Sequence, residues 1–164
     1  MNKRTQTLLF VVADWLSAVL AWGIFYVYRK LIIESQKFGY DVFALDKKFY
    51  IGILLIPVCW VFIYAITGAY TNVYRKSRLK ELGQTLYLSV IGVLIIFFSL
   101  LLDDTVISYK SYYHTFFTLL TLHFTITATF RFILSTTVVH KIHKRQIGFN
   151  TVMIGSNTNA VNLL

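Results

Sequence analysis

Long apolar runs alternate with short polar segments along this chain. Four such runs cover residues 7–28, 49–70, 84–102 and 112–139. A helix needs about 20 apolar residues to cross the hydrocarbon core of a bilayer, and each run has about that length or more. Four core helices of a soluble protein would be an alternative, but the lengths argue against it. The pattern predicts an all-α membrane protein, a bundle of four transmembrane helices.

The composition agrees with this fold class. Of the 164 residues, 57% are hydrophobic and only 14% are charged, whereas soluble domains are about 45–50% apolar and about a quarter charged. A net charge of +9 also occurs in nucleic-acid-binding proteins, so the positions of the cations have to be considered. The single cysteine, Cys59, lies inside the second run and excludes an internal disulfide.

The cations predict the orientation of the bundle, because segments rich in lysine and arginine stay in the cytoplasm. If the N-terminus is inside, the cytoplasmic segments carry nine cations and one acid, and the external segments carry six cations and five acids. We therefore expect both termini inside (N-in, C-in) and no nucleic-acid partner. A basic collar should attract anionic lipid headgroups; it consists of Arg75, Lys76, Arg78, Lys80, Lys141, Lys144 and Arg145.

Two charged residues lie within the apolar runs, Asp14 in the first and Arg131 in the fourth. Each lies about two turns from the cytoplasmic end of its helix, at 3.6 residues per turn. An unpaired charge in lipid costs a few kcal/mol or more. We expect a structural ion pair that joins the first helix to the fourth, with side chains within about 6 Å of each other. The alternatives are a contact of either charge with a lipid phosphate or substrate, and an arginine that extends to the membrane surface.

Other polar residues in the runs predict packing rather than chemistry. In the third run Thr85, Ser89, Gly92 and Ser99 follow helical spacing, and small residues of this kind let membrane helices approach closely. In the fourth run a stripe of threonines also predicts a packed helix face; it consists of Thr115, Thr118, Thr121, Thr125 and Thr129. The external pair Asp103–Asp104 is interpreted as the water-exposed end of a helix. No catalytic, cofactor-binding or metal-binding residue is assigned.

The last segment has a different pattern. A short, partly β-branched run at 151–154 is followed by Gly155, Ser156 and Asn157, and then by a segment able to begin a helix. This order is typical of the first strand–turn–helix of a Rossmann-like α/β domain. The nucleotide-binding fingerprint is incomplete, because Asn157 and Ala160 replace its second and third glycines. We divide the chain into a transmembrane module, 1–145, and the start of a truncated cytoplasmic Rossmann-like domain, 146–164.

The whole arrangement resembles a known family. Its features are four helices, a central segment with Gly68-Ala69-Tyr70 and Tyr74-Arg75-Lys76-Ser77-Arg78-Leu79-Lys80-Glu81-Leu82, a basic exit, and Val152-Met153-Ile154-Gly155. In these features the chain resembles the N-terminal membrane region of bacterial polyprenyl-phosphate glycosylphosphotransferases. These enzymes are also called undecaprenyl-phosphate sugar phosphotransferases or exopolysaccharide initiating transferases.

The resemblance implies a place in surface polysaccharide biosynthesis in the bacterial cytoplasmic (inner) membrane. Such enzymes move a sugar phosphate from a nucleotide sugar to undecaprenyl phosphate, using an Asp-Glu pair and Mg²⁺ in a C-terminal catalytic domain. This chain contains no such domain, so no catalytic residue carries over, and polyprenyl phosphate would bind the missing domain. We expect this module to anchor and assemble the enzyme as a homo-oligomer. Two alternatives remain open: the membrane module of a nucleotide-sugar 4,6-dehydratase, and a stand-alone accessory protein for a lipid-linked sugar.

Overall fold

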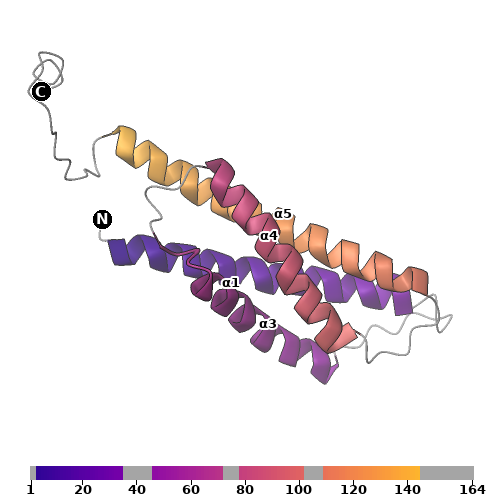
Figure 1. Cartoon of the computed structure of the whole chain (residues 1–164). Coiled ribbons are helices and arrows are strands. Elements are labelled where there is room, and N and C mark those ends of the chain that lie inside the picture. Colours follow the sequence, from indigo (N-terminus) through magenta and orange to yellow (C-terminus); the bar gives the residue numbers. More distant parts are fainter. Residues whose placement is uncertain (1–2, 35–45, 72–77, 102–108, 145–164) are drawn as a thin grey trace, which may run out of the picture.

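The structure is a computed structural model that describes residues 3–34, 46–71, 78–101 and 109–144 (Figure 1). In this part of the chain the main elements are α1 (Lys3–Tyr28), α3 (Lys47–Ile66), α4 (Arg78–Ile96) and α5 (Tyr109–His143). Short π-helical stretches, Arg29–Glu34 and Phe97–Leu101, continue α1 and α4. Within these described ranges, four helices are long and apolar enough to cross a membrane. The predicted all-α, membrane-type fold is therefore confirmed, whereas the expected strand–turn–helix at 146–164 lies outside the described residues.

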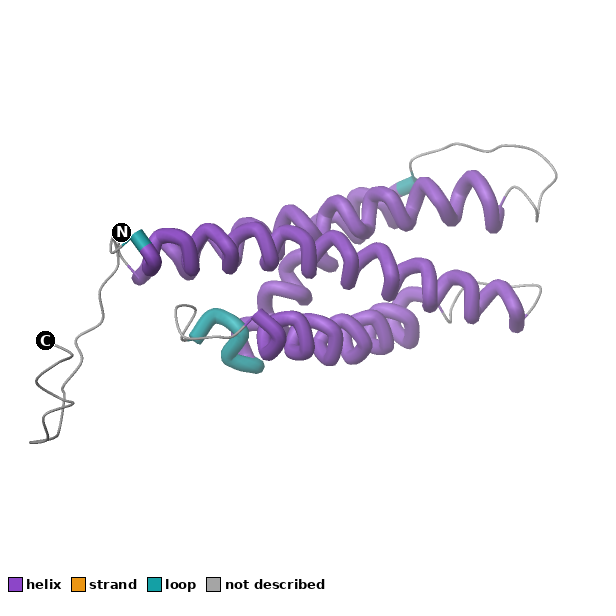
Figure 2. Tube along the Cα trace, turned by 90° about the horizontal axis from the view of Figure 1, so that it is seen from above, coloured by secondary structure: helices purple, strands orange, loops and turns teal. Residues whose placement is uncertain are grey.

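The four helices run side by side as a bundle (Figures 1 and 2). Helix α1 packs mainly against α5 and α3, and α4 packs mainly against α5 and less closely against α3. The order around the bundle is thus α1, α3, α4, α5, with α1 diagonally opposite α4. The beginnings of α1 and α4 and the end of α5 lie at the same end of the bundle (Figure 1). We call this the N-terminal end of the bundle.

Helix α3 ends at Ile66, four residues before the limit expected from hydropathy. The backbone of Gly68 has φ 67°, a left-handed conformation that glycine adopts without the steric cost of a Cβ atom. The N–H of Ala69 donates to Tyr64 O and the N–H of Gly68 to Ala65 O. These two bonds form a Schellman motif, which satisfies carbonyl groups that the helix end would leave unpaired. A local turn therefore ends the helix within a sequence that remains apolar to Tyr70.

Helix α4 begins at Arg78, six residues before the expected start at residue 84. Hydropathy placed this segment in a loop because it is charged. Arginine, leucine, lysine and glutamate are all good helix formers, however, so the same residues extend the helix. As a result, Arg78, Lys80 and Glu81 belong to the beginning of α4, and Glu81 is buried.

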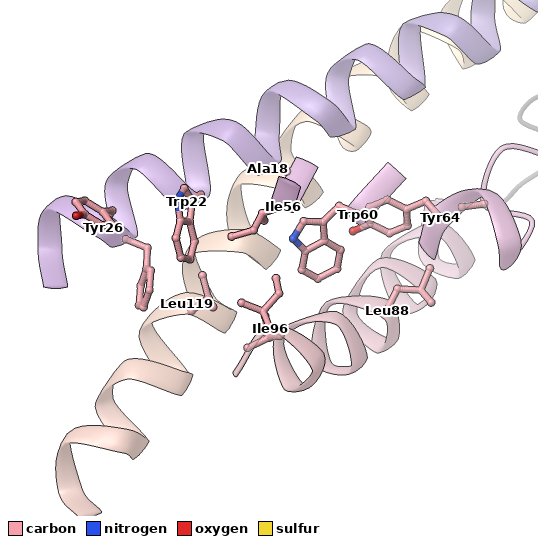
Figure 3. Packing of buried hydrophobic residues seen from close by; sticks show 12 residues of the cluster. Ala18, Trp22, Tyr26, Ile56, Trp60, Tyr64, Leu88, Ile96 and Leu119 are labelled. Atoms are coloured by element: carbon pink, nitrogen blue, oxygen red, sulfur yellow. The ribbon is translucent and has the colours of Figure 1, made fainter. Parts of the chain in front are cut away.

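Two tryptophans of the core fill space that glycines leave free. Trp60 of α3 and Trp22 of α1 belong to a buried cluster to which all four helices contribute (Figure 3). A Cβ atom at Gly92 of α4 would overlap the Trp60 ring, and one at Gly52 of α3 would overlap Trp22. The small residues thus allow close helix packing, as predicted for Thr85, Ser89 and Gly92, which are buried; Ser99 is exposed.

Candidate functional site: a buried ion pair that joins four helices

The structure brings Asp14 and Arg131 into direct contact. Arg131 Nε donates to Asp14 Oδ1 at 2.8 Å, and Arg131 Nη2 donates to Asp14 Oδ2 at 2.7 Å. Two parallel bonds of this kind match the planar guanidinium to the carboxylate and are stronger than bonds between neutral groups. The side chains are 0% and 3% exposed. The pair therefore joins α1 to α5 well inside the 6 Å limit set from the sequence, and Arg131 does not extend to the membrane surface.

Arg131 also reaches the other two helices. Its Nη1 donates to Thr85 Oγ1 of α4 at 3.3 Å. Its guanidinium carbon lies 4.1 Å from the centre of the Tyr64 ring of α3, a distance at which the ring face attracts a cation. A single side chain thus contacts α1, α3 and α4 from its place on α5.

A second layer of hydrogen bonds surrounds the pair. Ser17 Oγ donates to the Asp14 carbonyl at 2.8 Å and lies 3.1 Å from Thr127 Oγ1, which ties α1 to α5 once more. Nε2 of His123 lies 3.4 Å from both Thr127 Oγ1 and Tyr64 Oη. All of these side chains are buried. We call the set Asp14, Ser17, Tyr64, Thr85, His123, Thr127 and Arg131 the polar network.

His123 was not identified from the sequence, although it lies at the centre of this network. Its ring is stacked on Trp60, with 3.6 Å between ring centres and an angle of 13° between the planes. The signal that would have identified it is its position on α5, since His123, Thr127, Arg131 and Ser135 are spaced by four residues and lie on one helix face. Trp60 and Tyr64 have the same spacing on α3 and were also missed.

Tyr70 follows α3 and lies next to the network. Burial raises the pKa of its phenol above the ordinary value, and the negative charge of Asp14 raises it further. Its hydroxyl group is buried and has no hydrogen-bond partner in the described part of the chain. The phenol is thus a neutral group beside the carboxylate and adds no charge to the site.

The threonine stripe of the fourth helix does not form the packed face that the sequence predicted. Thr121, Thr125 and Thr129 are exposed, whereas Thr115 is buried at one end. Thr129 Oγ1 donates to the Thr125 carbonyl of its own helix at 2.7 Å. A hydroxyl group that is satisfied within its helix can face lipid without losing a hydrogen bond. The packed face is instead the one that carries His123, Thr127 and Arg131.

The basic collar is described only in part. Arg78 and Lys80 are exposed at the beginning of α4, and Lys141 and Lys144 lie at the end of α5. These two helix ends are both at the N-terminal end of the bundle (Figure 1). Arg75, Lys76 and Arg145 lie outside the described residues, as does the Asp103–Asp104 pair. The described residues of the basic collar thus gather at one end of the bundle.

The chemistry open to the polar network is limited, because its strongest groups already bind one another. Both oxygens of the Asp14 carboxylate accept bonds from Arg131, and every nitrogen of the guanidinium donates. Among residues 3–34, 46–71, 78–101 and 109–144, no three His, Cys, Asp or Glu side chains gather closely enough to hold a metal ion. No protein-family model matches this chain, and neither does any curated protein or solved structure.

Proposed function

We propose that this chain is the membrane-anchoring and assembly module of an initiating sugar-phosphate transferase. The complete enzyme would move a sugar phosphate from a nucleotide sugar to undecaprenyl phosphate at the bacterial cytoplasmic membrane. The proposed activity rests on the family resemblance in 68–82 and 152–155. The proposed anchoring role rests on the four membrane-length helices. Mg²⁺, the nucleotide sugar and undecaprenyl phosphate would all bind a catalytic domain beyond this chain.

The observation that carries the anchoring role is the place of Arg131 among the four helices. The side chain holds Asp14 of α1 and Thr85 of α4 by hydrogen bonds and lies against Tyr64 of α3. A reacting group needs access to substrate, whereas these groups are buried and directed toward one another. The network therefore supports a scaffold that holds its helices in one arrangement.

The positions of the described collar residues support a particular orientation. Arg78, Lys80, Lys141 and Lys144 lie at helix ends that share the N-terminal end of the bundle. Cations at this end favour the cytoplasmic side, with both ends of the module there. In this orientation a catalytic domain that follows α5 would lie at the inner leaflet, where a nucleotide sugar and a polyprenyl phosphate can meet.

The test uses the polypeptide from its natural membranes. Its intact mass shows whether it continues beyond Leu164, and purified material is then assayed for sugar-phosphate transfer to undecaprenyl phosphate with Mg²⁺. We expect a longer chain that transfers sugar phosphate, and no transfer by residues 1–164 alone. A longer chain that reduces a nicotinamide cofactor would support the dehydratase instead. A native chain that ends at Leu164 would contradict the proposal and favour the accessory protein.

The anchoring role itself is tested with Arg131→Ala in the longer polypeptide, and Lys144→Gln serves as the matched control at an exposed cation. We expect Arg131→Ala to lower the amount of enzyme in the membrane while each remaining molecule keeps its turnover number. If the amount is unchanged and the turnover number falls, Arg131 acts in the chemistry and the module is more than an anchor.

A further inference from the structure

A small notch opens between α4 and α5 near the N-terminal end of the bundle, and we call it the α4–α5 notch. Its inner wall carries Glu81 and Thr85 from α4 and Arg131 and Ser135 from α5, and Arg78 and Phe132 lie at its rim. Its volume is about 10 Å³. This is close to the least space that holds one water molecule, and an ammonium group has a similar size.

Glu81 distinguishes this notch from an ordinary gap between helices. Its side chain is 91% buried, since only 9% of its surface is exposed. Within the described part of the chain, its carboxylate has no hydrogen-bond or ion-pair partner. Arg131 lines the same notch, but Asp14 already neutralises its charge. At the inner wall Glu81 is thus without a counter-charge in contact, while the cation Arg78 lies at the rim, and a carboxylate at such a position is stabilised by a cation.

The rim of the notch faces the surroundings of the bundle. Phe132 is exposed, and the guanidinium carbon of the exposed Arg78 lies 5.7 Å from the centre of its ring. The helix that starts at Arg78 continues to Ser99, over 22 residues, or about 33 Å at 1.5 Å per residue. Because the hydrocarbon core is about 30 Å thick, the first turn of this helix lies at the level of the lipid headgroups. A headgroup can therefore reach both Arg78 and Glu81.

We propose that the α4–α5 notch binds the headgroup of a phospholipid with a primary ammonium group. The ammonium enters the notch and donates hydrogen bonds to Glu81, and the phosphate of the same lipid lies against Arg78. These two residues are three positions apart on α4, which is a rise of about 4.5 Å and suits a headgroup with two carbons between its charges. A trimethylammonium group is too large for the notch and has no N–H to donate.

The experiment compares three lipids with identical acyl chains, added to the purified protein in detergent. They are phosphatidylethanolamine, its trimethylated counterpart phosphatidylcholine, and the anionic phosphatidylglycerol. Native mass spectrometry measures the affinity of each, and the thermal midpoint gives a second readout. We expect the ethanolamine lipid to bind about two- to fivefold more tightly than the choline lipid, the range of an ion pair that solvent can reach.

Three variants test which residue binds the ammonium group and which binds the phosphate. Glu81→Gln should abolish the preference for ethanolamine over choline, whereas Arg78→Gln should weaken both lipids equally, because both carry the phosphate. Lys144→Gln, an exposed cation outside the notch, should change neither. The proposal is overturned if the wild-type protein binds both lipids equally, or if Glu81→Gln keeps the preference. It is also overturned if only phosphatidylglycerol stabilises the protein, which would indicate general attraction to the basic collar. The wild-type comparison decides even if a variant does not fold.

Discussion

Two ion pairs of equal length lie in different parts of this molecule. Asp14–Arg131 and Lys30–Asp46 both have a closest N–O distance of 2.7 Å. The first pair is 0% and 3% exposed, whereas Lys30 is 11% and Asp46 is 49% exposed. Water reaches the second pair through the half-exposed Asp46, but nothing except protein reaches the first. Burial rather than distance therefore decides how much each pair matters to the fold.

The two pairs also differ in the kind of contact that surrounds them. Asp46 accepts a bond of 3.3 Å from Tyr26, which packs against Phe49 in the aromatic part of the core. Around Arg131, by contrast, the contacts are directional hydrogen bonds from several helices. Apolar contacts tolerate small shifts, whereas a bidentate bond does not. The polar network thus selects which helices meet, and the aromatic part adds packing.

The largest expected effect comes from removing one partner of the buried pair. Arg131→Ala should lower the free energy of unfolding by about 3–5 kcal/mol, because it leaves the Asp14 carboxylate buried without a counter-charge. The measurement is a denaturant titration of the protein in detergent micelles. The double variant Asp14→Leu with Arg131→Met should recover most of this loss, since apolar replacements leave no unpaired charge. Equal losses in the single and double variants would contradict this account.

A smaller effect is expected where the core approaches the polar network. Gly92→Ala places a methyl group in the Trp60 ring, and overpacking of this kind costs about 1–3 kcal/mol. Gly23 is the matched control, because a Cβ atom there meets nothing within 4 Å. Gly23→Ala should be neutral or slightly stabilising, since alanine is the better helix former. Thermal unfolding of both variants in one detergent makes the comparison; equal midpoints would show that Trp60 moves aside freely.

A third prediction compares the stability cost of replacing a buried threonine of α5 with that of replacing an exposed one. Thr127→Val removes the contact between Thr127 and Ser17 across two helices, and bonds of this kind in membranes contribute about 0.6–1.7 kcal/mol. Thr129→Val removes only a bond within its own helix and should cost less. Denaturant titration of the two variants tests this order, and the reverse order would mean that the outward face packs against something.

The smallest effect should appear at the exposed pair. Asp46→Asn should change the free energy of unfolding by at most about 1 kcal/mol, because water screens a pair this exposed. The difference from the wild-type protein should shrink further at high salt. A loss as large as that of Arg131→Ala would remove the distinction between the two ion pairs.

The sequence predicted the coarse fold because membrane helices follow directly from length and hydropathy. It also placed Asp14 and Arg131 at one depth, because each lies about two turns from the cytoplasmic end of its run. Opposite charges at one depth in lipid are expected to pair, since an unpaired charge there is costly. It did not locate the ends of α3 and α4. Those depend on the turn at Gly68 and on helix formation by charged residues, and hydropathy detects neither.

Hydropathy alone did not distinguish the two polar faces of α5. Thr125 and Thr129 looked as suitable for packing as Thr127, and only the contacts across the bundle distinguish them. His123 was missed for a similar reason. Its spacing of eight residues from Arg131 places it on the packed face, but its partners Trp60 and Tyr64 belong to another helix and are known only from the structure.

Asp14 and Arg131 are 117 positions apart in the sequence, and this separation has a consequence for how the protein is made. The ribosome delivers α1 to the membrane before α3, α4 and α5. Asp14 therefore has no contact with Arg131 until the three other helices have been synthesised. An unpaired charge in lipid costs a few kcal/mol until it is neutralised. The nascent bundle is therefore less stable until α5 brings Arg131 into contact with Asp14. A chain that stops before Arg131 keeps that cost, because Asp14 then has no cation to pair with.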